Sequence, residues 1–274
     1  MRFGAHVSAA GGVAKALDRA AQMGADAAQI FLSSPRSWSF KPPDPLPDVP
    51  ALMAMTGITS VVVHASYLIN IASLDDALWT KSVSLLSATL QAAHQMGIEA
   101  VILHPGSHRG SGLDSVMPRW ASAIGQALEK LDGVSLLLEN TAGGGGTLGR
   151  NLDEIALLAD VANNFGSSGI CLDTQHLFAS GYDLRDLSTL ASLADELHNR
   201  FGSVTYLHLN DSKTDVGSNH DRHENIGEGK IGATALAAFL ALPVLANAIA
   251  ILEVPGDGTG PRKEDIAAAR TLAP

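Results

Sequence analysis

Residues 204–208 of the chain read Val-Thr-Tyr-Leu-His, and residues 221–223 read Asp-Arg-His. The first stretch is short, apolar and partly β-branched, so it predicts a buried strand that ends on His208. Side chains two positions apart in an extended segment point the same way, so Asp221 and His223 would face a common point. Imidazole and carboxylate groups are common metal ligands. This stretch therefore predicts a metal site at the mouth of a barrel.

Apolar segments of strand length alternate with longer segments of helical period along the whole chain. The predicted strands are 3–7, 27–31, 60–64, 99–104, 134–139, 168–173, 204–208 and 248–253. The predicted helices are 12–23, 50–57, 76–96, 115–131, 152–164, 185–200, 232–241 and 264–272. This alternation predicts an α/β fold with a parallel sheet closed into one (β/α)₈ TIM barrel. A chain of 274 residues suits a single domain over 1–274.

Composition and charge narrow the setting. There is no N-terminal signal pattern and no apolar run of about 18 residues, so a cytoplasmic protein with no membrane partner is expected. The single Cys171 suits a reducing compartment and, in its apolar run, reads as a small buried hydrophobe. The net charge of −10 counts against a nucleic-acid partner, although it does not exclude a locally basic rim.

Six consecutive predicted strands end on a histidine or a carboxylate. These residues are His64, His104, Glu139, Asp173, His208 and Glu253. One histidine at a strand end is more often a cap or a rim residue, but six equivalent positions favour a shared purpose. The carboxyl ends of barrel strands are where active sites are built. Converging acids and imidazoles repel one another or shift their pKa values unless cations lie between them, so the pattern indicates metal.

The loops on the same face add three more candidate ligands. His176 follows Asp173 by one helical turn, and Asp221 and His223 complete a set of nine. Mixed imidazole and carboxylate ligands favour zinc, with manganese or iron as alternatives at one position. Nine side chains are too many for one tetrahedral ion but suffice for three if a carboxylate bridges two of them. His6 ends the first strand and is a candidate to orient a ligand or a water from outside this set.

Several short motifs carry a resemblance that covers almost the whole chain. They are Gly-Ala-His-Val-Ser-Ala-Ala-Gly-Gly at 4–12, His-Ala-Ser-Tyr-Leu-Ile-Asn at 64–70, His-Pro-Gly-Ser-His at 104–108, Glu-Asn-Thr-Ala-Gly at 139–143, Cys-Leu-Asp-Thr-Gln-His at 171–176, Asn-Asp-Ser-Lys at 210–213, Asp-Arg-His at 221–223 and Gly-Glu-Gly at 227–229. With these motifs the chain resembles endonuclease IV, a family of zinc-dependent apurinic/apyrimidinic endonucleases on a xylose-isomerase-like barrel. Every metal-ligand position of the family is filled here by the expected residue type.

The resemblance implies a trinuclear zinc cluster and a reaction. Its implied groups are Glu139, His64 and His104 for the first ion, Glu139, Asp173, His208 and Glu253 for the second, and His176, Asp221 and His223 for the third. In this assignment Glu139 bridges two ions and holds the attacking water. The implied activity is cleavage of duplex DNA on the 5′ side of an abasic site, leaving a 3′-hydroxyl and a 5′-deoxyribose phosphate. Removal of 3′-blocking groups is also implied.

Recognition of DNA is expected from the loops after the second and third strands. By resemblance, Arg36, Tyr67 and Leu68 enter the DNA stack, fill the gap and support a bent duplex with flipped nucleotides. A monomer is expected, because one face of the barrel must stay open for the duplex. The sequence departs from the family at Val254, where the family often has threonine after the last ligand.

The main alternative is a metal-dependent sugar isomerase or epimerase on the same barrel. Such enzymes also end their strands on acids and histidines, but they need one or two metal ions. The third set of ligands, His176 with Asp221 and His223, is not required for a proton or hydride shift on a sugar. This set favours the nuclease.

Overall fold

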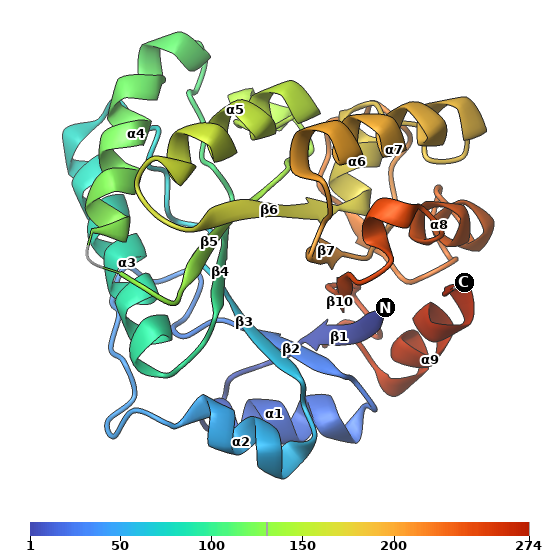
Figure 1. The fold of residues 1–274 in the computed structure, drawn as a ribbon, viewed down its shortest axis with the longest axis horizontal. Helices are drawn as coiled ribbons and strands as arrows, with labels where there is room; N and C mark the ends of the chain where they lie inside the picture. The colour runs from blue at the N-terminus through green and yellow to red at the C-terminus, as the bar shows by residue number, and fades with distance from the viewer. Residues whose placement is uncertain (130, 274) are drawn as a thin grey trace.

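The computed structural model describes residues 1–129 and 131–273 and contains a closed barrel of eight parallel strands. Going round the barrel, the strand order is β1-β10-β7-β6-β5-β4-β3-β2. Helices surround the strands on the outside (Figure 1). The predicted single (β/α)₈ barrel is confirmed.

The barrel strands lie close to their predicted positions. They are β1 (Arg2–His6), β2 (Ala27–Ile30), β3 (Ser60–His64), β4 (Ala100–Leu103), β5 (Ser135–Glu139), β6 (Ser168–Asp173), β7 (Tyr206–His208) and β10 (Ile249–Leu252). Most of their residues are buried, as in a parallel sheet that is covered on both faces. In such strands a near-continuous apolar run is the signal, and β3 (Ser-Val-Val-Val-His) is an example.

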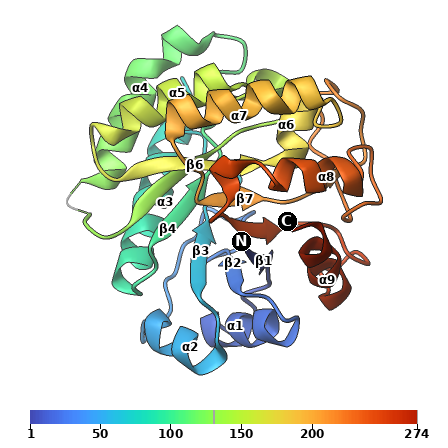
Figure 2. The same ribbon diagram turned by 45° about the vertical axis from the view of Figure 1, so that its right-hand side comes forward.

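The predicted helices are present, with ends that differ from the predicted ones by at most three residues. The structure has α1 (Val13–Gln22), α2 (Val49–Thr56), α3 (Asp76–Gln95), α4 (Leu113–Leu128), α5 (Leu152–Asn163), α6 (Thr174–Ser180), α7 (Leu187–Phe201), α8 (Ala233–Leu240) and α9 (Lys263–Leu272), with 3₁₀ turns at Gly144–Gly146 and Pro243–Leu245. Helix α4 ends three residues before the predicted 115–131, and position 130 lies outside the described residues. Figure 2 shows α5 and α7 on the side of the barrel opposite to α1 and α2.

Between β6 and α8 the structure differs from the prediction in two places. The single turn expected after Asp173 is a longer helix, α6, and it begins with the Asp173 side chain accepting from the backbone N–H of His176. The loop after β7 contains a small antiparallel pair, β8 (Asp211–Ser212) and β9 (His223–Glu224). Two-residue strands are too short to give a periodic signal in the sequence.

The barrel interior has its own apolar layer beneath the strand ends. Its members are Ala27, Val62, Ala100, Ile102, Leu137, Cys171, Tyr206, Ile249 and Ile251. Cys171 is fully buried there, and burial raises the pKa of its thiol to about 11. It is thus a small core residue and not a reactive nucleophile. In the described part of the chain, no helix has the length and apolarity needed to cross a membrane.

Candidate metal centre

Glu139 lies at the centre of the barrel mouth with its two oxygens turned to different imidazoles. Oε2 is 3.1 Å from His64 Nε2 and 3.0 Å from His104 Nε2. Oε1 is 3.0 Å from His208 Nδ1. Glu139 ends β5 and is fully buried, so it has no water to stabilise its charge. Buried carboxylates require such cationic or hydrogen-bonding partners.

A second group of candidate ligands gathers around His208 at the end of β7. His208 Nδ1 lies 3.3 Å from Glu253 Oε2 and 3.9 Å from Asp173 Oδ2. One ligand atom from each of Glu139, Asp173, His208 and Glu253 can be chosen so that all four lie within 4.8 Å of one another. Glu139 also belongs to the group with His64 and His104. A single carboxylate shared by two groups is the geometry of a bridging ligand.

The third group comes from α6 and the loop that leads into β9. His176 Nε2 and His223 Nε2 lie 3.3 Å from opposite oxygens of the Asp221 carboxylate. The compact cluster here consists of Asp173, His176 and His223, and Asp173 Oδ2 is 3.6 Å from His223 Nε2. Asp221 is about half exposed, whereas Asp173 is fully buried. The structure therefore brings all nine candidates to one mouth, but the compact third group contains Asp173 in place of Asp221, which lies beside His176 and His223.

Four of the histidines turn their other ring nitrogen to a carbonyl oxygen. His64 Nδ1 lies 2.7 Å from the Ala65 carbonyl, and His176 Nδ1 lies 2.9 Å from the Asn140 carbonyl. His223 Nδ1 is 3.3 Å from the Glu253 carbonyl, and His208 Nε2 is 2.8 Å from a side-chain amide oxygen of β2. A carbonyl oxygen only accepts, so each of these nitrogens carries the proton. The opposite nitrogen then faces the centre and is the one that would bind a cation.

The residues present thus fit a cluster of bound metal ions. The inward nitrogen of His223 is buried and has no hydrogen-bond partner within the described residues. Lone pairs of imidazoles facing carboxylate oxygens repel unless a cation or a proton lies between them. Fixing the outer nitrogen on a carbonyl is also how proteins orient histidine ligands of metals.

The electrostatics of the metal-free site follow from burial and proximity. Burial alone would raise the pKa of Glu139, but the imidazoles of His208 and His104 hold that pKa well below its usual value. Burial lowers the pKa of His64, and this effect outweighs the nearby Glu139. His64 is therefore a neutral imidazole, which is the form that binds metal.

Two buried asparagines that the sequence reasoning did not single out hold the ligands in place. Asn140 accepts from the backbone N–H of Asp173 at 2.6 Å and donates to its carbonyl at 3.2 Å. Asn210 donates to Asp173 Oδ2 at 2.7 Å and accepts from the backbone N–H of Glu253 at 2.9 Å. Both follow a strand that ends on a ligand. An amide in an apolar, strand-end context was the signal available in the sequence.

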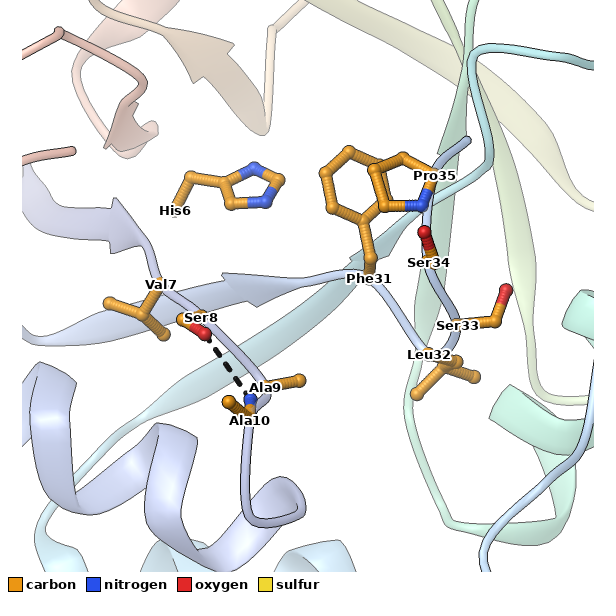
Figure 3. Close-up of a pocket in the computed structure, with 10 residues that line it drawn as sticks. All are labelled: His6, Val7, Ser8, Ala9, Ala10, Phe31, Leu32, Ser33, Ser34 and Pro35. Atoms are coloured by element: carbon orange, nitrogen blue, oxygen red, sulfur yellow. Dashed lines mark hydrogen bonds between the residues drawn. The ribbon is translucent and has the colours of Figure 1, made fainter. Parts of the chain in front are cut away.

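His6 lies at the edge of the centre, where the sequence predicted an orienting role. Its Nδ1 is 3.0 Å from Glu253 Oε1, and its ring centroid is 4.6 Å from that of Phe31. Figure 3 shows these two rings side by side. Both line a cavity of about 450 Å³ that is formed with the loops after β1 and β2. His6 contacts a candidate ligand and belongs to none of the three clusters.

The rim residues expected to contact DNA lie around the same opening. Arg36 is exposed on the loop after β2, and Leu68 is half-buried after β3. Tyr67 is exposed, and its ring centroid lies 5.3 Å from that of His64. Tyr67 also lines a cavity of about 360 Å³ over the candidate ligands, together with the basic side chains of Lys213 and Arg222. The mouth thus combines an aromatic side chain with two cations.

Comparison with known proteins agrees with this geometry. The family model described as "Xylose isomerase-like TIM barrel" matches residues 17–272. A protein named "Probable endonuclease 4" from Halothermothrix orenii is 39% identical over 260 residues, which is 93% of this chain and 94% of that protein. The crystal structure of endonuclease IV from Thermus thermophilus has a TM-score of 0.84 and 36% identity, covering 99% of this chain and 98% of that one. A D-tagatose 3-epimerase-like protein, with a TM-score of 0.72, 21% identity and coverage of 99% and 95%, shares the fold alone.

The closed barrel with acids and histidines at its strand ends defines a member of the xylose-isomerase-like TIM barrels. Within that class, the chain belongs to the endonuclease IV family. The resemblance drawn from its motifs is confirmed.

Proposed function

We propose that the chain is a DNA-repair hydrolase that cuts duplex DNA on the 5′ side of abasic sites with a cluster of three zinc ions. The products are a 3′-hydroxyl and a 5′-deoxyribose phosphate, and the same site removes 3′-phosphate and 3′-phosphoglycolate groups. Near full-length similarity to relatives named endonuclease 4 supports the class of reaction. The three compact groups, which contain eight of the nine candidate ligands, support the metal chemistry.

The observation that carries the proposal is the position of Glu139. Its two oxygens face two separate groups of ligands, so one carboxylate is able to hold two ions close together. Zinc ions bound there would acidify a water to a pKa of about 7 and neutralise the attacking and leaving oxygens of a phosphodiester. The chain's own contribution is to fix the imidazole lone pairs and to keep the bridging carboxylate buried and ionised.

The substrate is expected to approach across the open end of the barrel. Lys213 and Arg222 line the cavity over the ligands and are placed to contact phosphate oxygens. Arg36, Tyr67 and Leu68 project from neighbouring loops and are proposed to fill the space left by a missing base. The net charge of −10 is compatible with this role, because bound zinc and the local cations set the field at the mouth.

Sugar epimerisation is the competing function on this fold. The epimerase-like neighbour shows that the backbone geometry does not distinguish the two activities. The third ligand group of His176, Asp221 and His223 favours the nuclease, because a proton shift on a sugar needs fewer ions.

The deciding experiment uses a labelled duplex that contains one tetrahydrofuran abasic analogue. This analogue cannot undergo β-elimination, so a cut on its 5′ side that leaves a 3′-hydroxyl is hydrolysis. Metal content is measured on the same sample, and about three zinc ions per chain are expected. A matched duplex without the analogue should stay intact. Absence of cleavage with one or two metals bound would reject the nuclease and direct the search to ketose substrates.

A further inference from the structure

One polar side chain in the barrel interior has no role in the functions described so far. Gln29 lies in β2, between Ala28 and Ile30, and it is fully buried. Ala27, two positions earlier, belongs to the apolar layer inside the barrel. Gln29 therefore points into the barrel one layer above it, directly beneath the metal ligands. A buried amide is costly unless its hydrogen bonds are made, so its partners reveal its role.

Gln29 makes contact with both His208 and Glu253. Its Nε2 lies 2.6 Å from Glu253 Oε1. Its Oε1 lies 2.8 Å from His208 Nε2. The same Nε2 is 2.8 Å from His6 Nδ1, so the two amide hydrogens have two potential acceptors. One planar group thus spans two candidate ligands, His208 at the end of β7 and Glu253 directly after the adjacent strand β10.

These contacts fix the orientation of the amide without reference to any metal. A carboxylate only accepts, so the NH₂ end of Gln29 must face Glu253. The carbonyl end then faces His208, and His208 Nε2 must carry the ring proton. The remaining ring nitrogen, Nδ1, lies 3.0 Å from Glu139 and 3.3 Å from Glu253 and is the atom that would bind a cation. Gln29 therefore selects the tautomer of His208 in which Nδ1 is ready to bind a cation.

We propose that Gln29 is a positioning residue for the metal ion held around His208 and Glu253. The inference rests on the proposed zinc centre. The other three histidines with an oriented outer nitrogen use backbone carbonyls, which no substitution can remove. Of these four histidines, only His208 uses a side chain, so its orientation depends on the identity of a residue outside the ligand set. Loss of Gln29 would leave the Nε2 proton without an acceptor and let the other tautomer compete.

The test is a chelator competition on the zinc-loaded full-length chain. Gln29→Met keeps the length of the side chain and removes the hydrogen bonds of the amide to Glu253, His208 and His6. The affinity for one zinc ion per chain should fall about 10–100-fold, which is typical when a hydrogen-bond partner of a ligand is lost. The affinities for the other two ions should be unchanged. The matched control is Tyr206→Phe. Tyr206 lies on the same strand as His208, and the substitution removes its buried hydrogen bond to Ser60. The control should hold all its zinc normally.

The outcomes separate this role from a merely structural one. Normal retention of every ion by Gln29→Met, or equal weakening in Tyr206→Phe, would overturn the proposal. If Gln29→Met does not fold by circular dichroism, Gln29→Asn is used, because it keeps the amide but withdraws it by one methylene. Gln29→Asn should still lower the affinity for one zinc ion and leave the other two unchanged. Unchanged zinc binding by this variant would count against the positioning role of Gln29. No DNA enters the assay, so failure of the wild type to cut abasic DNA would reject the proposed reaction and leave this result standing.

Discussion

At the scale of single residues, the centre is organised by groups that face two ways. Glu139 presents one oxygen to His64 and His104 and the other to His208. Asp173 caps helix α6 with Oδ1 and turns Oδ2 to the ligand cluster. Each such residue fixes the relative position of two parts of the site. Substitution at these positions should therefore damage the chemistry more than the fold.

Glu139→Gln is the most direct test of the bridging role. The amide loses the negative charge and presents NH₂ hydrogens to one set of ligands, so it cannot bridge two cations. Cleavage of abasic duplex should fall by at least about 100-fold, more than the loss of an outer partner costs, while the affinity for that duplex stays within a few-fold. Single-turnover rates and a binding titration on the same duplex measure both. The control Glu99→Gln changes an exposed acid and should be silent. Near-normal hydrolysis by Glu139→Gln would remove the bridging assignment.

Tyr67 tests whether the rim reads the missing base. It is exposed and lies beside the ligands, so truncation should leave the barrel intact. Tyr67→Ala should lower kcat/KM on an internal abasic site by about tenfold or more, because stacking by an aromatic side chain is worth about 1–3 kcal/mol. Hydrolysis of a 3′-phosphate end, where no gap must be filled, should change less. Tyr67→Phe is the control and should retain both activities. Equal losses on the two substrates would contradict a role in recognition.

At the scale of elements, Asp211 anchors the segment that carries Asp221 and His223. It is fully buried in β8, and its carboxylate accepts from the backbone N–H groups of Gly227, Gly229, Ile231 and Gly232. Gly229 is also required here, because a Cβ at that position would lie 2.5 Å from Asp211 Oδ1. The Asp211 carboxylate therefore holds together the two ends of the long loop between β7 and α8.

Asp211→Asn should destabilise this loop between β7 and α8. The amide turns hydrogens toward backbone donors and leaves several of them unpaired, which should lower the free energy of unfolding by roughly 2 kcal/mol or more. Because His223 lies on the same segment, the zinc ion of the third group should also be lost first to a chelator. Urea denaturation and zinc titration measure the two effects. Asp215→Asn, at an exposed position of the same loop, is the control. Unchanged stability and metal content would show that the segment does not depend on Asp211.

Comparison of the predicted with the observed elements shows which features of the fold and site the sequence predicts. The bounds of β3 and β6 were predicted to the residue, because apolar runs ending on His64 and Asp173 leave little choice. The strand-end pattern placed six of the nine candidate ligands at one mouth, and the loop motifs placed the other three there. The β8–β9 pair and the Gln29 contacts were not predicted, since they depend on neighbours distant in the chain. A polar residue inside an apolar strand, as at Gln29, was the one signal available for it.

At the scale of the whole molecule, the barrel is closed where its first and last strands meet. β1 pairs with β10 in parallel register from Arg2 with Ile249 to Ala5 with Leu252. Helix α9 packs beside this seam and reaches across it through Arg270, whose guanidinium lies 2.8 Å from Asp26 Oδ2. The same oxygen accepts from the backbone N–H of Phe3 at 2.8 Å. Asp26 thus ties the last helix to the first strand.

This tie should make closure sensitive to acid. Burial opposes ionisation of Asp26, but hydrogen bonds from Arg270 and Phe3 outweigh it and lower its pKa. A carboxylate whose pKa is lower in the folded than in the unfolded state stabilises the fold at pH values above its unfolded pKa of about 3.9. This stabilisation is lost as the pH falls through the pKa of the folded state. Asp26→Asn should therefore cost about 1 kcal/mol near neutral pH. The difference from wild type should shrink below about pH 4.

Urea denaturation of both proteins across this pH range measures that difference. Asp18→Asn is the matched control, because Asp18 forms an exposed pair with Lys15 inside one helix and ties no two elements together. Exposed pairs of this kind contribute little, so the control should track the wild type at every pH. If the cost of Asp26→Asn were the same at low and neutral pH, its carboxylate charge would not be what holds α9 to β1. The seam would then depend on strand pairing and apolar packing alone.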